Sequence, residues 1–270
     1  MTTRAKTMSA TLKAVVAAVK LAAAEEIMPR YMKVAHQRKS DGSLCTEADI
    51  AAQEVLTRKL QVILNVPVIG EEMAEAEQVA SWADGKEGVW CIDPIDGTSN
   101  FVRGLPYFAV SVALIREGRS SLGVVYNPVS EEVFAAELGR GAFLNGERLQ
   151  SRAVATTLSG ALANVDMKRL ESKLVERLAL DPPYASQRNF GASTLDWCYT
   201  AAGRYDLYLH GGQKLWDYAA GSLILQEAGG QACCLDHDDF DEGDVWQRSV
   251  VAALDPKLFE EWKTWLCARK

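Results

Sequence analysis

The sequence lacks the cysteine and histidine patterns of disulfide-rich and metal–thiolate proteins. Its six cysteines form no CxxC pair, and two of them, Cys233 and Cys234, are adjacent. This spacing excludes a disulfide framework, so we expect reduced and mostly buried thiols. The three histidines show no ligand-like spacing, and no GxSxG pattern occurs. Neither a histidine-rich metal site nor a serine hydrolase is therefore expected.

Long apolar runs and positive charge are also scarce. The longest uncharged run near the N-terminus is Ala14 to Val19, which is too short for an export signal or a membrane span. We therefore expect a cytoplasmic protein without a membrane partner. The net charge of −7 argues against nonspecific nucleic-acid binding but permits a local cation site. Repeats, low-complexity tracts and flexible linkers are absent, so residues 1–270 are expected to form a single domain.

Apolar spacing and turn residues predict a mixture of helices and antiparallel strands. A meander is expected from Tyr107 to Leu138, followed by a hairpin turn on Asn145-Gly146. Further strands are predicted over 66–70, 85–93 and 205–210. Helices are predicted over 9–35 (with an interruption near Pro29), 47–64, 169–180, 192–203, 216–230 and 260–269. This order indicates the α+β class rather than a strict βαβ alternation.

The stretch "DPIDGTSN" places two carboxylates in a rigid turn after an apolar strand. Pro94 fixes one backbone angle, and Gly97 permits an unusual one. Asp93 and Asp96 can then point to one side, where the Ile95 carbonyl can join them. Three hard oxygens that converge on a point are the ligands that Mg²⁺ prefers. The plainer alternative is a loop with an Asp cap and an Asx-turn.

The same turn leads into a predicted helix that begins near Thr98. Its first amides, at Gly97 and Thr98, lack intrahelical acceptors and favour an anion such as phosphate. Cation ligands beside amides that hold an anion are the parts needed for phosphoryl transfer to water.

Three other acidic segments stand at element ends. Glu71 and Glu72 follow the short strand "VIG", Asp217 follows Trp216 at a helix start, and Asp49 lies in the first turn after Thr46. Each has a plain alternative: a solvated face for the glutamates, a helix cap for Asp217, and compensation of the helix dipole for Asp49.

Taken together, "GEE", "DPIDGTSNF" and "WDYAAG" resemble the signatures of the inositol monophosphatase family of Mg²⁺-dependent, lithium-sensitive phosphatases. The resemblance runs from about Ala10 to the C-terminus. It implies a layered αβαβα sandwich of the inositol monophosphatase / fructose-bisphosphatase type. Residues 1–150 would form the metal-binding half, and residues 151–270 would supply Asp217 and the substrate-side residues. Members of the family are commonly homodimers.

The resemblance also assigns metal ligands, for two to three Mg²⁺ ions. Glu71, Asp93 and the Ile95 carbonyl would hold the first ion, and Glu71 would help to hold a third through water. Asp93, Asp96 and Asp217 would hold the second. Asp93 would thus bridge two ions, which leaves no charge unpaired in a poorly hydrated site.

Catalytic and phosphate-binding roles follow from the same resemblance. Asp49 and Thr98, with Glu71, would orient and activate the attacking water, and the Gly97 and Thr98 amides would bind the phosphate. Glu72 is expected to support the site rather than to bind metal. Lys39 is either a cation near the phosphate or a solvated surface lysine.

The substrate side departs from the family pattern. His210 stands where inositol phosphatases carry a glutamate, and Ser193 replaces a small apolar residue; Asp96 and Asp217 complete the expected substrate contacts. An imidazole cannot accept two polyol hydroxyls as a carboxylate does, but it can meet a second anionic group. The alternative for His210 is a strand-end histidine with a structural hydrogen bond.

The sequence therefore predicts a Mg²⁺-dependent phosphomonoesterase that acts on a small polyol or sugar phosphate of the inositol 1-phosphate type. Water would attack the phosphorus directly. Three alternatives stay open: the same chemistry on fructose 1,6-bisphosphate, 3′-phosphoadenosine 5′-phosphate or histidinol phosphate; a non-catalytic regulatory or binding role; and cation binding without turnover.

Overall fold

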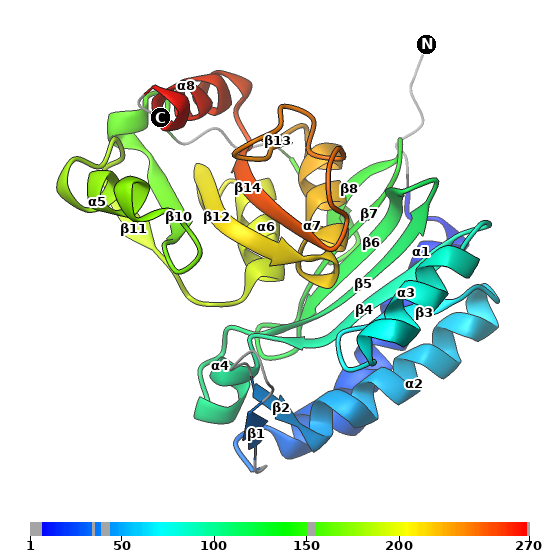
Figure 1. Cartoon of the computed structure of the whole chain (residues 1–270). Coiled ribbons are helices and arrows are strands. Elements are labelled where there is room, and N and C mark those ends of the chain that lie inside the picture. The colour runs from blue at the N-terminus through cyan, green and yellow to red at the C-terminus, as the bar shows by residue number, and fades with distance from the viewer. Residues whose placement is uncertain (1–6, 34–35, 39–43, 151–154, 269–270) are drawn as a thin grey trace.

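Two large β-sheets with a pair of helices between them form the body of the computed structural model (Figure 1). The structure describes residues 7–33, 36–38, 44–150 and 155–268. The strand order is β3-β4-β5-β6-β7-β8-β9 in the first sheet and β11-β10-β12-β14-β13 in the second. A small two-stranded sheet, β1 (His36–Arg38) with β2 (Leu44–Thr46), precedes the second helix.

The first sheet contains the predicted meander and hairpin, which are confirmed. Its first two strands run parallel, and the rest pair antiparallel with their sequence neighbours. Asn145 and Gly146 both have positive φ, at 51° and 84°, as the predicted hairpin turn requires. The strands are β3 (Val68–Gly70), β4 (Val89–Asp96), β5 (Ala109–Arg116), β6 (Arg119–Asn127), β7 (Glu132–Glu137), β8 (Gly141–Leu144) and β9 (Glu147–Arg148).

One face of this sheet is covered by α1 (Ala10–Ala22) and α2 (Glu47–Ile63), as Figure 1 shows. Thr46 caps α2 as predicted. The helix predicted over 9–35 is shorter: a π-helical turn (Ala23–Ile27) and a 3₁₀ turn (Met28–Arg30) follow α1. Proline has no N–H to donate back into the helix, which explains why the α-helical pattern is lost before Pro29. A further helix, α3 (Glu75–Asp84), was not predicted.

The middle layer consists of α6 (Ser193–Ala201) and α7 (Leu215–Ala228), which pack against each other and against both sheets. The two helices share one apolar core with the first sheet, to which Trp197 of α6, Leu223 of α7 and Phe134 of β7 contribute. The short α4 (Thr98–Arg103) follows β4 directly and lies beside β2 (Figure 1).

The second sheet is covered on its outer face by α5 (Ser172–Leu180) and α8 (Pro256–Cys267), whose apolar side chains share a core with it. A 3₁₀ turn (Leu158–Gly160) precedes this sheet. Its strands are β10 (Leu162–Asp166), β11 (Ser186–Arg188), β12 (Leu207–Lys214), β13 (Gln231–Cys233) and β14 (Gln247–Ala253), of which only β12 was predicted. The five layers confirm the expected αβαβα sandwich. Among the described residues, none of the helices has the length and apolar character needed to cross a membrane.

Candidate metal and phosphate site

The parallel pair β3 and β4 brings two acidic segments to one edge of the first sheet. Gly70 pairs with Ile92, so Glu71 and Asp93 are the next residues along the two strands. The Glu71 amide donates a hydrogen bond to the Ile92 carbonyl at 3.1 Å, which extends the pairing by one residue. Two carboxylates that lie far apart in the sequence therefore meet at the carboxyl ends of neighbouring parallel strands.

A β-bulge at the end of β4 puts Asp93 and Asp96 on the same side. Side chains three residues apart point to opposite faces of a regular strand. Here Asp93 pairs with Ser111 and Asp96 with Ala109, so the β4 strand holds one residue more than its partner across this interval. The extra residue re-aims the side chain that follows it. The Pro94-Ile95 step therefore gives the site its pair of convergent aspartates.

Asp217 reaches the same point from the middle layer. It lies in the first turn of α7, where its Oδ2 accepts a hydrogen bond from the Lys214 amide at 2.8 Å. One carboxylate oxygen each from Asp93, Asp96 and Asp217 lie within 4.8 Å of one another. The structure thus brings together three of the predicted metal ligands, from two separate elements.

The electrostatics of this cluster favour a bound cation. Burial, followed by the charges of Glu71, Asp96 and Asp217, raises the pKa of Asp93 well above its ordinary value. Burial and the charges of Asp96 and Glu71 raise the pKa of Asp217 to about 8. Buried carboxylates that repel one another are stabilised by an ion of opposite charge, and an all-oxygen donor set suits Mg²⁺. The residues present therefore fit the implied metal.

Asp49 and Thr98 lie beside the cluster. Asp49 is fully buried, and its Oδ2 accepts from the Thr46 amide at 2.7 Å and from the Thr46 hydroxyl at 2.6 Å. The Thr98 hydroxyl lies 3.4 Å from Asp49 Oδ1 and donates to the Ile95 carbonyl at 3.0 Å. One carboxylate oxygen of Asp49 is thus fixed by its own helix cap, and the other faces Thr98.

Gly97 begins the helix that follows the cluster, and glycine is required there. Its φ is +87°, and a β-carbon would lie 3.1 Å from both the Tyr107 carbonyl and the Ala192 β-carbon. The amides of Thr98 and Ser99 follow at the start of α4, ahead of the Asn100 amide, which donates to the Gly97 carbonyl at 2.8 Å. The predicted helix start after the two aspartates is confirmed.

The start of α6 holds Asp96 in place, and the sequence reasoning missed this contact. The amide and the hydroxyl of Thr194 both donate to Asp96 Oδ2, each at 2.7 Å. Burial nevertheless raises the pKa of Asp96, against these hydrogen bonds. Ser193, half-buried, precedes Thr194 at the same helix start. Only the position of Thr194 next to Ser193 in the sequence could have indicated this role.

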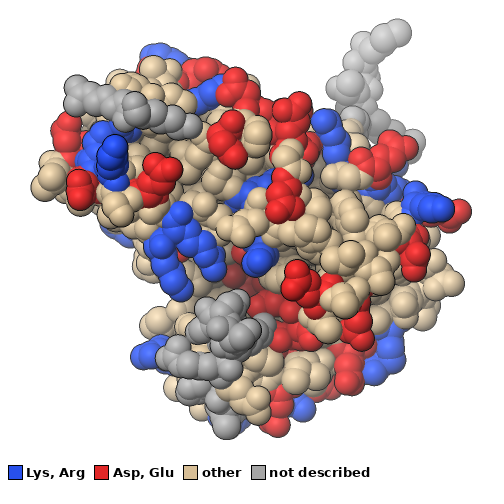
Figure 2. Space-filling model, viewed as in Figure 1, with Lys and Arg blue, Asp and Glu red and all other residues tan. Residues whose placement is uncertain are grey.

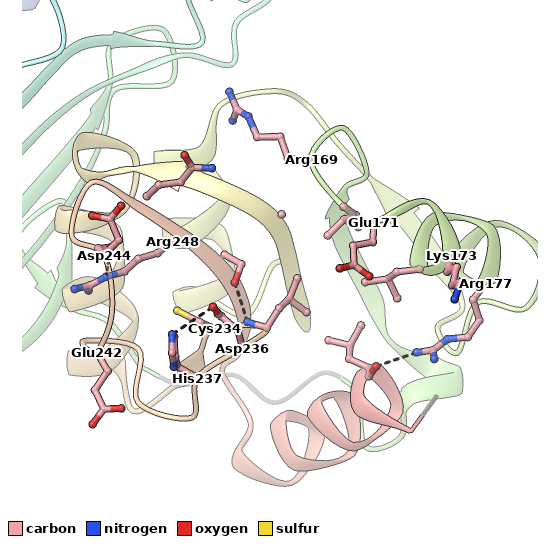
Figure 3. A pocket seen from close by; sticks show the side chains of 17 residues that line it. Arg169, Glu171, Lys173, Arg177, Cys234, Asp236, His237, Glu242, Asp244 and Arg248 are labelled. Atoms are coloured by element: carbon pink, nitrogen blue, oxygen red, sulfur yellow. Dashed lines mark hydrogen bonds and ion pairs between the residues drawn. The ribbon is translucent and has the colours of Figure 1, made fainter. Parts of the chain in front are cut away.

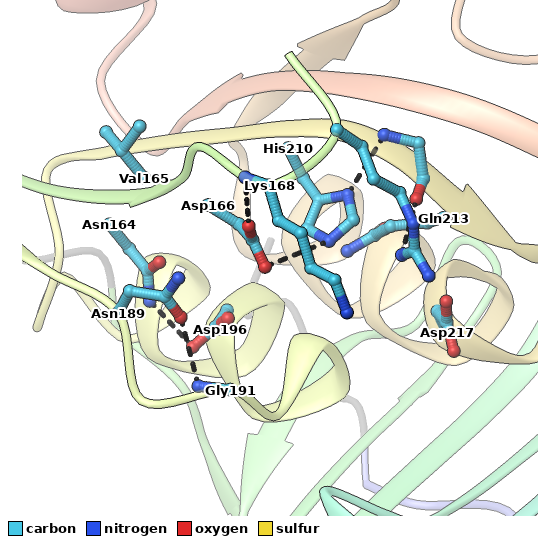
Figure 4. A network of polar contacts seen from close by, with 12 residues as sticks. Asn164, Val165, Asp166, Lys168, Asn189, Gly191, Asp196, His210, Gln213 and Asp217 are labelled. Atoms are coloured by element: carbon cyan, nitrogen blue, oxygen red, sulfur yellow. Dashed lines mark hydrogen bonds and ion pairs between the residues drawn. The ribbon is translucent and has the colours of Figure 1, made fainter. Parts of the chain in front are cut away.

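The surroundings of His210 bear on the two roles left open for it. The imidazole is buried, its Nδ1 accepts from the Gly212 amide at 3.1 Å, and its Nε2 lies 3.6 Å from Asp166 Oδ2 (Figure 4). Burial lowers the pKa of His210 to about 4, against the opposing effect of Asp166. A neutral histidine with structural hydrogen bonds is favoured over a cation that meets an anionic group.

Glu72 and Lys39 are the remaining residues singled out from the sequence. The Glu72 amide donates to Gln53 Oε1 at 3.0 Å, which fits the expected supporting role. Lys39 lies outside the described residues.

The molecular surface agrees with this placement. Figure 2 shows acidic side chains gathered in a hollow near the middle of one face, with Lys and Arg side chains along its edge. A separate cavity of about 820 Å³ lies between α5, β14 and the loop before β14, and contains side chains of both charges (Figure 3). None of the predicted site residues lines it.

Comparison with known proteins identifies relatives over nearly the whole chain. A sequence model of the inositol monophosphatase family matches residues 7–268. The inositol-1-monophosphatase of Caulobacter vibrioides is 34% identical over 233 residues, which are 83% of this chain and 88% of that protein. The Nus factor SuhB of Pasteurella multocida is 37% identical over 232 residues, which are 83% of this chain and 82% of that protein.

Solved structures agree with the fold. The extragenic suppressor protein suhB from Bartonella henselae superposes with a TM-score of 0.83 at 28% identity, covering 97% of this chain and 100% of that one. The IMPase of Thermotoga maritima superposes with a TM-score of 0.80 at 27% identity, covering 94% of this chain and 95% of that one. The similarity therefore extends from sequence motifs to the whole architecture.

Proposed function

We propose, since the chain belongs to the inositol monophosphatase family, that it is a Mg²⁺-dependent phosphomonoesterase of small polyol or sugar phosphates. The observation that carries the proposal is the convergence of Asp93, Asp96 and Asp217 within 4.8 Å beside the first turn of α4. We further propose a cytoplasmic homodimer that lithium inhibits.

The proposed metal ligands come from both halves of the chain. Glu71, Asp93 and the Ile95 carbonyl would hold one ion, and Asp93, Asp96 and Asp217 a second, with Glu71 contributing to a third through water. Bound Mg²⁺ would make an attacking water more acidic and would offset charge on the leaving alkoxide. Burial, and after it the charges of neighbouring carboxylates, raises the pKa of Asp93, and this supports the arrangement because bound cations stabilise the charged carboxylates.

The residues of the chain would position the reactants around these ions. Asp49 and Thr98 would orient the attacking water, with Asp49 Oδ1 as the proton acceptor, because its other oxygen already binds Thr46. The Gly97 and Thr98 amides would bind the phosphate oxygens. In both roles, the groups that stabilise the charge of the reacting phosphate and water are held in position before the substrate binds.

The substrate-side roles are proposed for four residues. Asp96 and Asp217 would contact the substrate from the metal cluster, and Ser193 from the start of α6. His210 would act from the end of the pocket by holding Asp166 and Gly212 in place. The leaving group is therefore expected to lie between α6 and β12.

Phosphate release from a substrate panel tests the proposal. The panel contains inositol 1-phosphate, fructose 1,6-bisphosphate, adenosine 3′,5′-bisphosphate and histidinol phosphate at fixed Mg²⁺. We expect release from at least one compound, loss of that activity in Asp93→Asn, and a lower kcat with little change in KM in Thr98→Ala. Near-normal activity of Asp93→Asn would refute the metal assignment. An effect of Thr98→Ala on KM alone would refute the water-orienting role.

A second function is suggested by the relatives that carry the name Nus factor SuhB, such as the one from Pasteurella multocida. We propose that this chain also serves as a regulatory partner in a larger assembly. An Asp93→Asn variant that loses turnover but still captures the same partners in a pull-down supports this role. Failure of both proteins to retain any specific partner would count against it.

A further inference from the structure

The loop that follows β10 is fixed against β12, close to the acidic cluster. Asp166 Oδ1 accepts a hydrogen bond from the Lys168 amide at 2.8 Å, and Asp166 Oδ2 faces His210 Nε2. At Gly211, a β-carbon would lie 2.1 Å from the Arg169 carbonyl oxygen, so only glycine permits this close approach. The backbone of Lys168 and Arg169 is therefore held in one position by the neighbouring strand.

The charge of Arg169 acts on Asp217, and the charges of Arg169 and Lys168 act on His210. Arg169 Nη1 donates to the Gly212 carbonyl at 3.0 Å, and the Arg169 charge acts to lower the pKa of Asp217. Figure 4 shows the Lys168 side chain beside His210, with its ammonium between Asp196 and Asp217 in this view. Both side chains are exposed. Within the described part of the chain, neither is ion-paired with a carboxylate at 4.0 Å or less.

Lys168 and Arg169 lie on a different side of the site from the start of α4, where the phosphate is proposed to bind. A phosphate bound at the start of α4 would be neutralised by metal and amides, so it has no need of Lys168. The pair instead lies beside β12, on the side where the alcohol part of the substrate is proposed to lie. Because His210 is neutral and buried, it does not supply positive charge there. Among the described residues, Lys168 and Arg169 are two exposed cations on this side that can attract an anion, and Lys214 at the end of β12 is a third.

We propose that Lys168, assisted by Arg169, binds a second anionic group, a carboxylate or a phosphate, on the alcohol part of the substrate. This inference rests on the proposed phosphatase function and narrows its substrate class to phosphate esters of anionic alcohols. Lysine binds such groups as a mobile point charge, so the subsite admits either anion.

Two matched substrate pairs test the subsite. 2-Phosphoglycerate differs from glycerol 2-phosphate by a carboxylate in place of one hydroxymethyl group, and fructose 1,6-bisphosphate differs from fructose 1-phosphate by one phosphate. We expect the wild-type protein to show a higher kcat/KM for the more anionic member of at least one pair. In Lys168→Met, this preference should fall about tenfold, chiefly through KM, as expected for one charge-assisted contact. The pair that responds identifies the anion.

Lys173→Met is the matched control. Lys173 is also an exposed lysine, and it lines the cavity between α5 and β14, to which Arg169 contributes but Lys168 does not (Figure 3). The Lys173→Met variant should keep the substrate preference of the wild-type protein. Equal turnover of both members of each pair by the wild-type protein would overturn the subsite and leave the phosphatase function standing. An equal loss of preference in both lysine variants would also overturn it. Release of phosphate from none of these four compounds, together with activity on inositol 1-phosphate, would overturn the subsite alone, whereas no release from any compound of either set would refute the proposed function itself.

Discussion

Single carboxylates in this site are held in place by hydrogen bonds from neighbouring residues. Thr194 binds one oxygen of Asp96, Thr46 binds one oxygen of Asp49, and the Lys214 amide binds one oxygen of Asp217. In each case one carboxylate oxygen is fixed, which leaves the other for function. This pre-organisation reduces the conformational freedom that metal binding must remove.

His210 offers a prediction at the same scale, because its pKa of about 4 lies below the ordinary value. The unfolded chain binds a proton near pH 6.5, whereas the folded protein resists one until about pH 4. Stability should therefore fall as the pH decreases through this window. The charge of Asp166 acts to raise the pKa of His210, whereas the charges of Arg169 and Lys168 act to lower it further.

His210→Asn keeps an acceptor for the Gly212 amide and removes the titration. Between pH 7 and pH 5, the wild-type protein should lose about 1 to 2 kcal/mol more free energy of unfolding than the variant. Urea unfolding at the two pH values, in EDTA, measures the difference. Equal losses would show that the imidazole does not titrate in this way.

At the scale of elements, the turn between β4 and α4 depends on Gly97. Gly97→Ala should destabilise the protein by about 1 to 3 kcal/mol more than Gly118→Ala. Both glycines have positive φ, but a β-carbon at Gly118 meets nothing within 4 Å, whereas at Gly97 it contacts Tyr107 and Ala192. Thermal unfolding of the two variants separates backbone strain from steric contact. Equal destabilisation would mean that packing around Gly97 adjusts freely.

Elements with a local signal were predicted well, and elements that depend on distant partners were not. The helix after Thr46 and the meander carry their own caps, turns and alternation. By contrast, β11 (Ser186–Arg188) has no apolar pattern and exists because it pairs with β10. The helix α3 buries only Gln78, so its sequence gives little apolar periodicity.

The same distinction applies to the site. Asp93, Asp96 and Asp217 stand in compact motifs, so their role could be predicted from nearby residues. Lys168 stands in no motif. Its position follows from the pairing of β10 with β12, which join residues more than forty positions apart in the chain. Such a contact depends on sheet topology, which apolar spacing does not specify.

At the scale of the whole molecule, the proposed metal ligands join two layers, because Asp93 lies on the first sheet and Asp217 on a middle-layer helix. Mg²⁺ should therefore raise the melting temperature of the wild-type protein by about 5 °C at a concentration near 100 times Kd. Asp93→Asn should respond less, and in EDTA it should melt no lower than the wild type, because it removes repulsion among buried carboxylates.

Scanning fluorimetry with Mg²⁺ and with EDTA measures both effects. The exposed Asp84→Asn provides a matched control, since it removes an acidic group on α3. If Asp93→Asn gained as much from Mg²⁺ as the control does, the ions would bind elsewhere.

The bulge in β4 and the loop after β10 belong to different sheets, and this separation has an evolutionary consequence. Replacing residues beside β12 alters which alcohol is accepted without touching the aspartates of the bulge. Selection for a new substrate can thus change the loop after β10 while the aspartates of β4 and α7 are inherited unchanged.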